Sequence, residues 1–282
     1  MMYRRQSIPG RRGSSCSGRL LIAALIAISS LVMYFSSRQD NPVTGETQYV
    51  DITVAQEIAL GLQAAPEMAE QFGGLDPDPN AQAIVDQIGN ELVQNSPAGR
   101  SPYRFDFHLL GDEHTINAFA LPGGQIFITR ALFDRLETEG ELAGVLGHEI
   151  GHVVGRHSAE RIAKTKLTEG LTGAAVIAAY DPNNPSSAGS AQIAAVIGQL
   201  VNMRYGREDE LESDFLGVCF MNDTGYDPRQ MVRVMQVLAE SRQGQAPPEF
   251  FSTHPNPENR IQRIQDAIQN LDQCPGPVSI VK

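Results

Sequence analysis

The spacing of hydrophobic positions changes several times along the chain. A continuous apolar run first covers residues 20–35. Apolar residues then recur every three or four positions, which is typical of amphipathic helices, and later alternate with polar residues, as in a half-buried strand. From residue 130 onward the spacing is helical. The predicted early elements are helices over 53–72 and 81–94 and short strands over 105–109, 116–121 and 125–129.

Helices, a small sheet and further helices predict an α+β fold dominated by helix. The chain has 282 residues, of which 41% are hydrophobic, enough for one sizeable domain. We expect a basic segment with a signal anchor over 1–38, a linker over 39–52 and the folded domain over 53–282. Two segments rich in small apolar residues, 171–180 and 191–201, are each too short to span a bilayer. We expect them to pack internally; a lid or a membrane-facing hairpin is the alternative.

The charge distribution supports this division. Residues 1–38 contain no acidic residue, yet the whole chain has a formal net charge of −11, so the remainder is strongly acidic. Such a domain lacks the basic surface that nucleic acid requires, and we expect no nucleic-acid partner. The basic residues before the apolar run are Arg4, Arg5, Arg11, Arg12 and Arg19.

A basic flank before an apolar run predicts a cytoplasmic N-terminus and a translocated remainder. The Ser36-Ser37-Arg38-Gln39 sequence after the run gives no clear A-x-A cleavage site. We therefore predict an uncleaved anchor in the inner membrane, with the domain in the periplasm. Secretion after cleavage of a signal peptide is the alternative.

The chain has three cysteines, Cys16, Cys219 and Cys274, and no C-x-x-C pair, which excludes a cysteine zinc ribbon. In an exported domain Cys219 and Cys274 could form a disulfide; two unpaired thiols are equally compatible with the sequence.

The helical segment 141–156 contains the motif His148-Glu149-Ile150-Gly151-His152. Two helix residues four apart differ in direction by only about 40°, so both imidazoles can reach one metal ion. Glu149 would lie beside them, able to take a proton from metal-bound water. Two solvated helix histidines would be the simpler explanation of the same motif.

Zinc requires a third protein ligand. His157 would lie about 140° from His152 on a continuing helix, facing away, so we do not expect it to bind the metal. Glu210 is the best candidate, because Asp214 four residues later shares its face and could accept the second N–H of a zinc-bound histidine. Glu212 is expected to point the other way. An ordinary acidic, solvated helix face remains the alternative.

These residues resemble the HtpX and CAAX-prenyl-endopeptidase family of gluzincin metallopeptidases, metallopeptidase family forty-eight. The resemblance implies that His148, His152 and Glu210 bind one Zn²⁺ per chain and that Glu149 is the general base, with Asp214 orienting His148. The matching segments are 117–124 (NAFALPGG), the motif 148–152 with His157, Arg207 with Glu210 and Asp214, and Thr253-His254-Pro255 with Arg260.

The resemblance also implies roles for four further residues. His254 would lie near the metal, where it steadies the oxyanion or occupies the open zinc position at rest; a loop histidine capping the next helix is the alternative. Arg260 would anchor that loop through a carboxylate. Asn117 and Ala118 would lie on an edge strand that holds the peptide substrate by β-addition, although a strand-end turn would also explain Asn117.

The sequence therefore predicts a zinc-dependent endopeptidase acting on unfolded or misassembled envelope polypeptides. A single N-terminal apolar segment disfavours prenyl-protein processing and is similar to the single-domain periplasmic members. Two other classes remain open: a chaperone-like holdase that cuts rarely or never, and a membrane-anchored scaffold with an incidental motif. The sequence does not predict the oligomeric state.

Overall fold

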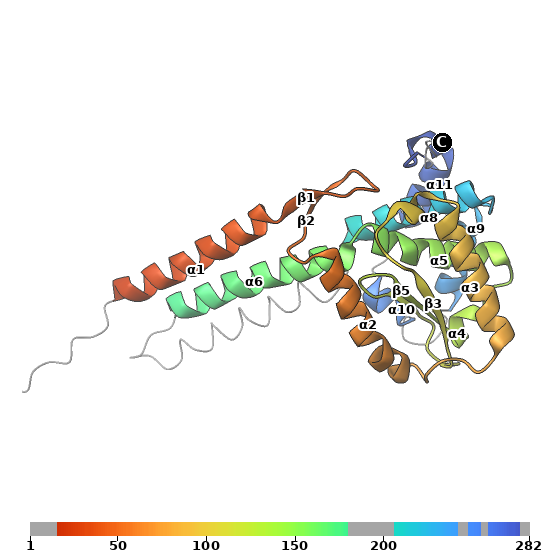
Figure 1. Cartoon of the computed structure of the whole chain (residues 1–282), viewed down its shortest axis with the longest axis horizontal. Coiled ribbons are helices and arrows are strands. Elements are labelled where there is room, and N and C mark those ends of the chain that lie inside the picture. Colours follow the sequence, from red (N-terminus) through yellow and green to blue (C-terminus); the bar gives the residue numbers. More distant parts are fainter. Residues whose placement is uncertain (1–15, 180–205, 242–247, 255–258, 277–282) are drawn as a thin grey trace, which may run out of the picture. The chain divides into compact units, whose positions relative to one another are not determined.

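The computed structural model describes residues 16–179, 206–241, 248–254 and 259–276. These residues form mainly helices with two small sheets (Figure 1), which confirms the predicted class. The elements are α1 (Cys16–Ser36), β1 (Arg38–Asp40), β2 (Thr47–Tyr49), α2 (Val54–Gln71), α3 (Pro79–Gln94), η1 (Pro97–Arg100), β3 (Asp106–Leu110), β4 (Ala118–Ala120), β5 (Gln125–Thr129), α4 (Arg130–Phe133), α5 (Glu139–Val154), α6 (His157–Ala179), α8 (Arg207–Thr224), α9 (Gln230–Glu240), α10 (Phe250–Thr253), α11 (Arg260–Gln269) and η2 (Leu271–Gln273).

The chain divides into two compact units. The first contains α1 and the part of α6 that begins at Thr165. Among the described residues, α1 is the one helix that is long and apolar enough to cross a membrane, with 19 residues of mean hydropathy 2.0. Within this unit α6 packs closely against α1 at Gly170. A β-carbon at that position would lie only 2.1 Å from Ser30 Oγ of α1. The small-residue segment 171–180 forms the last part of α6, which ends at Ala179. The segment 191–201 lies outside the described residues.

The second unit, residues 37–164 and 202–282, contains a three-stranded sheet in the order β3-β5-β4. β5 pairs in parallel with β3 and antiparallel with β4. The turn before β5 requires glycine, because Gly123 and Gly124 have φ of +83° and +110°. β4 is left at the edge of this sheet.

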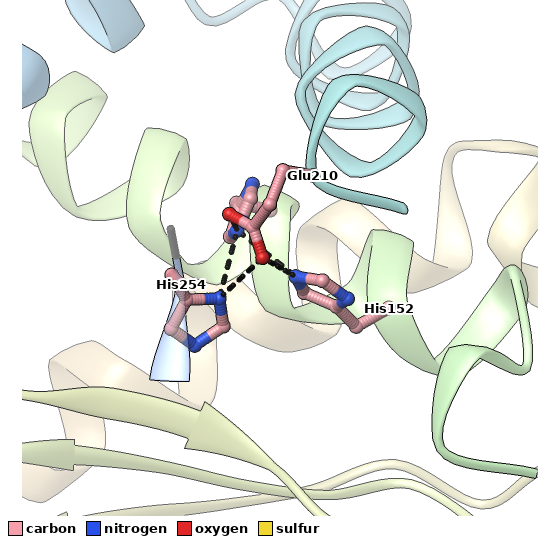
Figure 2. Close-up of side chains that lie close together, drawn as sticks. His152, Glu210 and His254 are labelled. Carbon is pink, nitrogen blue, oxygen red and sulfur yellow. Dashed lines mark hydrogen bonds and ion pairs between the residues drawn. The ribbon is translucent and has the colours of Figure 1, made fainter. Parts of the chain in front are cut away.

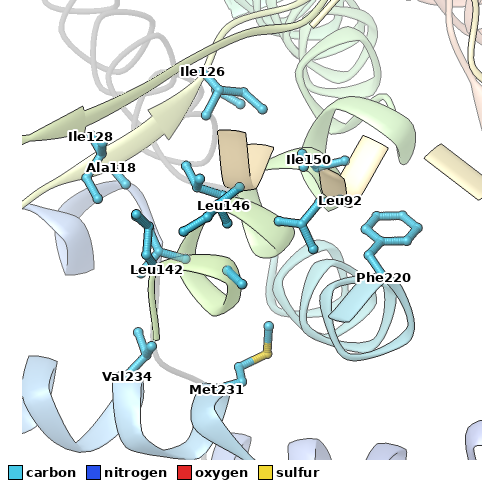
Figure 3. Close-up of a cluster of buried hydrophobic side chains, with 14 of the residues drawn as sticks. Leu92, Ala118, Ile126, Ile128, Leu142, Leu146, Ile150, Phe220, Met231 and Val234 are labelled. Atoms are coloured by element: carbon cyan, nitrogen blue, oxygen red, sulfur yellow. The ribbon is translucent and has the colours of Figure 1, made fainter. Parts of the chain in front are cut away.

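Helix α5 lies at the centre of the second unit and is buried over every residue from Glu141 to Val154. Thr138 and Glu141 begin it with a capping box. Its apolar side chains pack between the strands and the helices α8 and α9 (Figure 3), so the helix has no solvent-exposed face along this stretch. The core residues labelled there include Ile126 and Ile128 of β5, Leu142, Leu146 and Ile150 of α5, Phe220 of α8, and Met231 and Val234 of α9.

A short hairpin of β1 and β2 overlaps the predicted linker 39–52 and begins one residue before it. Its Asn41 Nδ2 donates to the carbonyl of Val154 at 2.8 Å, and Gln48 Nε2 donates to that of Gly155. These two buried amides satisfy carbonyls at the C-terminal end of α5, which have no partner inside the helix. The predicted domain boundaries stay a prediction.

A disulfide joins Cys219 of α8 to Cys274, 55 residues later, with Cα atoms 5.6 Å apart. The question that the sequence left open is thereby answered in favour of pairing. The bond connects α8 to the segment that follows α11.

Candidate metal centre

The two histidines of the H-E-x-x-H motif lie on one face of α5. Their Nε2 atoms are 3.1 Å apart, and their rings meet edge to face with centroids 4.7 Å apart. Both side chains are buried. The structure thus brings His148 and His152 together as the helical spacing predicts.

Helix α8 brings Glu210 to the same point. Glu210 Oε1 lies 3.4 Å from His152 Nε2, and Oε2 lies 3.6 Å from His148 Nε2. Figure 2 shows the carboxylate directed between the rings of His152 and His254. One donor atom from each of these four side chains lies within 4.8 Å of the others. The predicted acidic ligand and the motif histidines therefore form one buried group.

Two glycines allow α5 and α8 to approach closely enough for this contact. A β-carbon at Gly147 would lie 3.4 Å from Gly217 Cα, and one at Gly217 would lie 3.1 Å from His148 N. Larger residues here would separate the helices that carry the two histidines and the carboxylate.

His254, at the end of α10, completes the group. Its Nδ1 lies 3.1 Å from Glu210 Oε1 and 3.4 Å from His148 Nε2, and its ring stacks on Phe250. Burial would lower the pKa of His254, but the carboxylates of Glu149 and Glu210 raise it above its ordinary value. Burial would raise the pKa of Glu210, yet the positive charge of His254 and the hydrogen bond from that ring hold it well below its usual range.

Glu149 is fully buried beside the group. Neither of its oxygens accepts a hydrogen bond from any residue that the structure describes, and His254 Nε2 is 3.7 Å from Oε1. Burial raises the pKa of this carboxyl group. A buried carboxylate with free acceptor positions next to a metal-binding group is suited to take up a proton.

Asp214 and Arg260 support His148 from behind. Asp214 Oδ1 lies 2.9 Å from His148 Nδ1, and Arg260 donates to Asp214 through Nε at 2.7 Å and Nη2 at 2.9 Å. Arg260 Nη1 also lies 3.2 Å from Glu210 Oε2. Burial would raise the pKa of Asp214, but the charge of Arg260 and the hydrogen bond from His148 lower it. The buried guanidinium thus faces the predicted ligand and the predicted orienting carboxylate.

These donors fit a divalent metal ion. The Asp214 carboxylate can only accept, so a neutral His148 carries its proton on Nδ1 and directs the Nε2 lone pair at the group. The Nε2 atom of His152 lies 3.1 Å from the Nε2 atom of His148, and the Glu210 carboxylate lies beside both rings. Converging electron pairs of this kind are compensated by a cation, and two imidazoles with one carboxylate match the preferences of zinc.

The predicted substrate residues lie at the start of the edge strand β4. Ala118 is the first residue of β4 and Asn117 precedes it, and both are buried. Asn117 donates its backbone N–H to Thr129 Oγ1, whereas its side-chain oxygen has no partner among the described residues. Phe250 of α10 donates its backbone N–H to Ile116 O at 3.2 Å. Peptide binding at this edge stays a prediction.

Sequence reasoning missed the place of His157. The structure sets its Nδ1 2.9 Å from Nδ1 of His152, because α5 ends at Val154 and the helical path breaks at Arg156, whose φ is +57°. Gly155 directly after the periodic helix was the signal that the helix stops there. Glu212, which was expected to point away, reaches His157 with an oxygen 3.2 Å from Nε2.

Comparison with known proteins assigns a family to this geometry. The family described as peptidase family M48 matches residues 79–268, more than half of the chain. The chain belongs to this family. M48 is the metallopeptidase family that the sequence motifs resemble, so the prediction of a metallopeptidase of this family is confirmed. His148, His152, Glu210 and His254 lie where they could hold a metal ion.

Similar proteins include the β-barrel assembly-enhancing protease of Escherichia coli (strain K12), 30% identical over 86% of this chain and 50% of that protein. A putative protease of the same name from Vibrio cholerae is 32% identical over 78% of this chain and 46% of its own length. The mitochondrial metalloendopeptidase OMA1 of Schizosaccharomyces pombe is 29% identical over 87% of this chain and 71% of OMA1. The chain therefore spans about half the length of the bacterial M48 relatives that it matches.

Proposed function

We propose that this chain is a zinc endopeptidase of the cell envelope that hydrolyses unfolded or misassembled polypeptides. The observation that carries the proposal is the convergence of His148, His152 and Glu210 in one buried group with Glu149 beside it. The apolar helix α1 and the disulfide indicate an envelope location, because disulfides persist in oxidising compartments.

Bound zinc would polarise the scissile carbonyl and lower the pKa of water toward about 7. Glu149 takes the proton of the attacking water at its carboxylate and passes it to the leaving amine, a role suited to its raised pKa. Asp214 fixes the ring of His148 through Nδ1. The edge strand β4, with Asn117 and Ala118, holds the substrate backbone by strand addition.

In this proposal the arrangement of the four side chains is the resting state of the site, because His254 is one of them. Four protein side chains reach the same point, whereas catalytic zinc sites keep one position open for water. His254 would therefore hold that fourth position at rest and would have to leave it before hydrolysis. A direct role in stabilising the oxyanion is the alternative.

The N-terminal segment is proposed to remain as an inner-membrane anchor, with the M48 domain in the periplasm. Its apolar stretch, Gly18–Ser36, is long enough to cross a bilayer. The length of the mature protein and its extraction from membranes by alkaline carbonate decide between an anchor and a cleaved signal peptide. The relatives named for β-barrel assembly support misassembled envelope proteins as the substrate class.

The proposal is tested with the full-length chain in detergent and unfolded casein as substrate. Cleavage should stop with a zinc chelator and return with added zinc. Glu149→Gln should bind zinc normally and lose at least about 100-fold of the activity, because it removes the general base. Glu139→Gln, an exposed position of the same helix, is the matched control and should cleave normally.

A holdase would give a different pattern. Wild type and Glu149→Gln would then suppress aggregation of casein equally, and neither would release fragments. Normal cleavage by Glu149→Gln would overturn the proposed mechanism.

A further inference from the structure

His157 occupies the side of His152 that faces away from the metal-binding group. Its Nδ1 lies 2.9 Å from His152 Nδ1, whereas Nε2 of His152 points toward Glu210 at 3.4 Å. On the other side of the His157 ring, Nε2 lies 3.2 Å from Glu212 Oε2. The Ser213 hydroxyl is 3.2 Å from the same Nδ1 of His157. The ring is fully buried, so the contacts are sheltered from bulk water.

The backbone is shaped to bring His157 to this position. Arg156 adopts a left-handed conformation, uncommon for a residue with a side chain, and its guanidinium is held by the buried carboxylate of Glu57. Gly155 leaves room for the imidazole, because a β-carbon there would lie 2.5 Å from His157 Nε2. Because this strained residue is held by a contact from α2, we interpret the break between α5 and α6 as a feature that places His157.

For neutral imidazole rings, the contacts assign each proton to one nitrogen. A carboxylate only accepts, so His157 donates Nε2–H to Glu212 and keeps a lone pair on Nδ1. That lone pair accepts Nδ1–H of His152, which leaves the Nε2 lone pair of His152 directed at the group. The opposite assignment would put a hydrogen on Nε2 of His152, where the metal must bind.

We propose that His157 is a positioning residue that fixes the tautomer and ring orientation of the ligand His152, with Glu212 fixing His157 in turn. The inference rests on the proposed zinc-dependent function and extends it to residues outside the ligand set. It gives the two motif histidines parallel supports: Asp214 behind His148, and His157 with Glu212 behind His152. Both carboxylates come from α8, two residues apart.

Outer contacts to zinc-bound histidines typically contribute 10- to 100-fold in metal affinity. His157→Ala should therefore bind zinc about 10- to 100-fold more weakly than wild type, measured by competition with a chromophoric chelator on the full-length chain. His157→Gln should recover part of the loss, since its side-chain oxygen can accept from His152. Activity of His157→Ala should return at saturating zinc, because no reacting group has been removed.

Glu212→Gln is the second variant and keeps the test decisive if His157→Ala fails to fold. The Glu212 side chain is 26% exposed, so the change is tolerated, and an amide that can present its N–H₂ group no longer enforces one tautomer. Zinc affinity should lie between those of wild type and His157→Ala. Glu208→Gln, an exposed carboxylate on the same helix, is the matched control and should bind zinc like wild type.

A purely structural role would lower the thermal stability of the metal-free protein and leave the zinc affinity of the folded fraction unchanged. That result, or wild-type zinc affinity in both His157→Ala and Glu212→Gln, would overturn the inference while leaving the proposed function intact. If wild type itself bound no zinc, the proposed function would fail first. The absorption spectrum of the cobalt-substituted protein should also change in His157→Ala and stay constant in Glu208→Gln.

Discussion

Gly151 of α5 lies directly against the backbone of Ser213 in α8: a β-carbon at position 151 would sit 2.9 Å from both Cα and the carbonyl oxygen of Ser213. The contact falls within the H-E-x-x-H motif and three residues after Glu210. The separation of these two backbones therefore sets the distance between the histidines and the carboxylate.

Gly151→Ala should push α8 away from α5. We expect a loss of about 1–3 kcal/mol in the free energy of unfolding, as for overpacked cores, together with weaker zinc binding. Gly144→Ala is the control on the same helix, because its nearest neighbours would be 3.4 Å away. Thermal unfolding with and without zinc measures both effects, and equal behaviour of the two variants would contradict the prediction.

Arg260→Met should be strongly destabilising. It leaves Asp214 and Glu210 buried without the cation that now contacts both. Removing one partner of a buried charge pair typically costs about 3–5 kcal/mol. Arg263→Met, at an exposed position of α11, should change the urea midpoint little. A similar midpoint for both variants would show that the guanidinium does not hold the two carboxylates.

Cys274→Ser should lower stability by about 4 kcal/mol, because the disulfide closes a long loop and limits the unfolded chain. The bond spans 55 residues. Urea unfolding should show that reductant lowers the midpoint of wild type to that of Cys274→Ser and leaves the variant unchanged. A midpoint insensitive to reductant would indicate that the pair is not formed in the isolated protein.

His254→Ala should keep zinc and increase cleavage of unfolded casein severalfold. Three ligands remain in the group, and the fourth position becomes open to water. Metal content and turnover are measured on the same preparation. Retained zinc with lower turnover would instead favour the oxyanion role of His254.

Local signals were sufficient to predict most elements near the site. The strand 125–129 has the same bounds as β5, and the helix predicted from residue 53 agrees with α2, because Thr53 provides a capping box. The relative direction of His148 and His152 follows from helical geometry alone. Glu210 was found because its helix also carried Asp214 at the spacing that a supporting carboxylate requires.

Other features depend on contacts distant in sequence. A continuing helix would make His157 face away from His152. Its actual position depends on the left-handed residue Arg156, whose side chain is held by Glu57, 99 residues earlier, and local sequence does not reveal that contact. The β1–β2 hairpin was expected to be a linker, since strands of three residues carry no periodicity and its buried amides bond to carbonyls near residue 154. The direction of Glu212 could not be inferred without the position of His157.

The stretch of α8 from Glu210 to Asp214 supplies both the acidic ligand and its supports: Glu210 belongs to the metal-binding group, Glu212 meets His157 and Asp214 meets His148. Before α8 docks, α5 offers only two imidazoles, with neither an acidic ligand nor the carboxylates that orient them. A partly folded chain would therefore retain metal poorly and cut nothing. Docking of α8 on α5 and the onset of peptidase activity would then be a single event, so that no partly folded form of the chain acts as a protease.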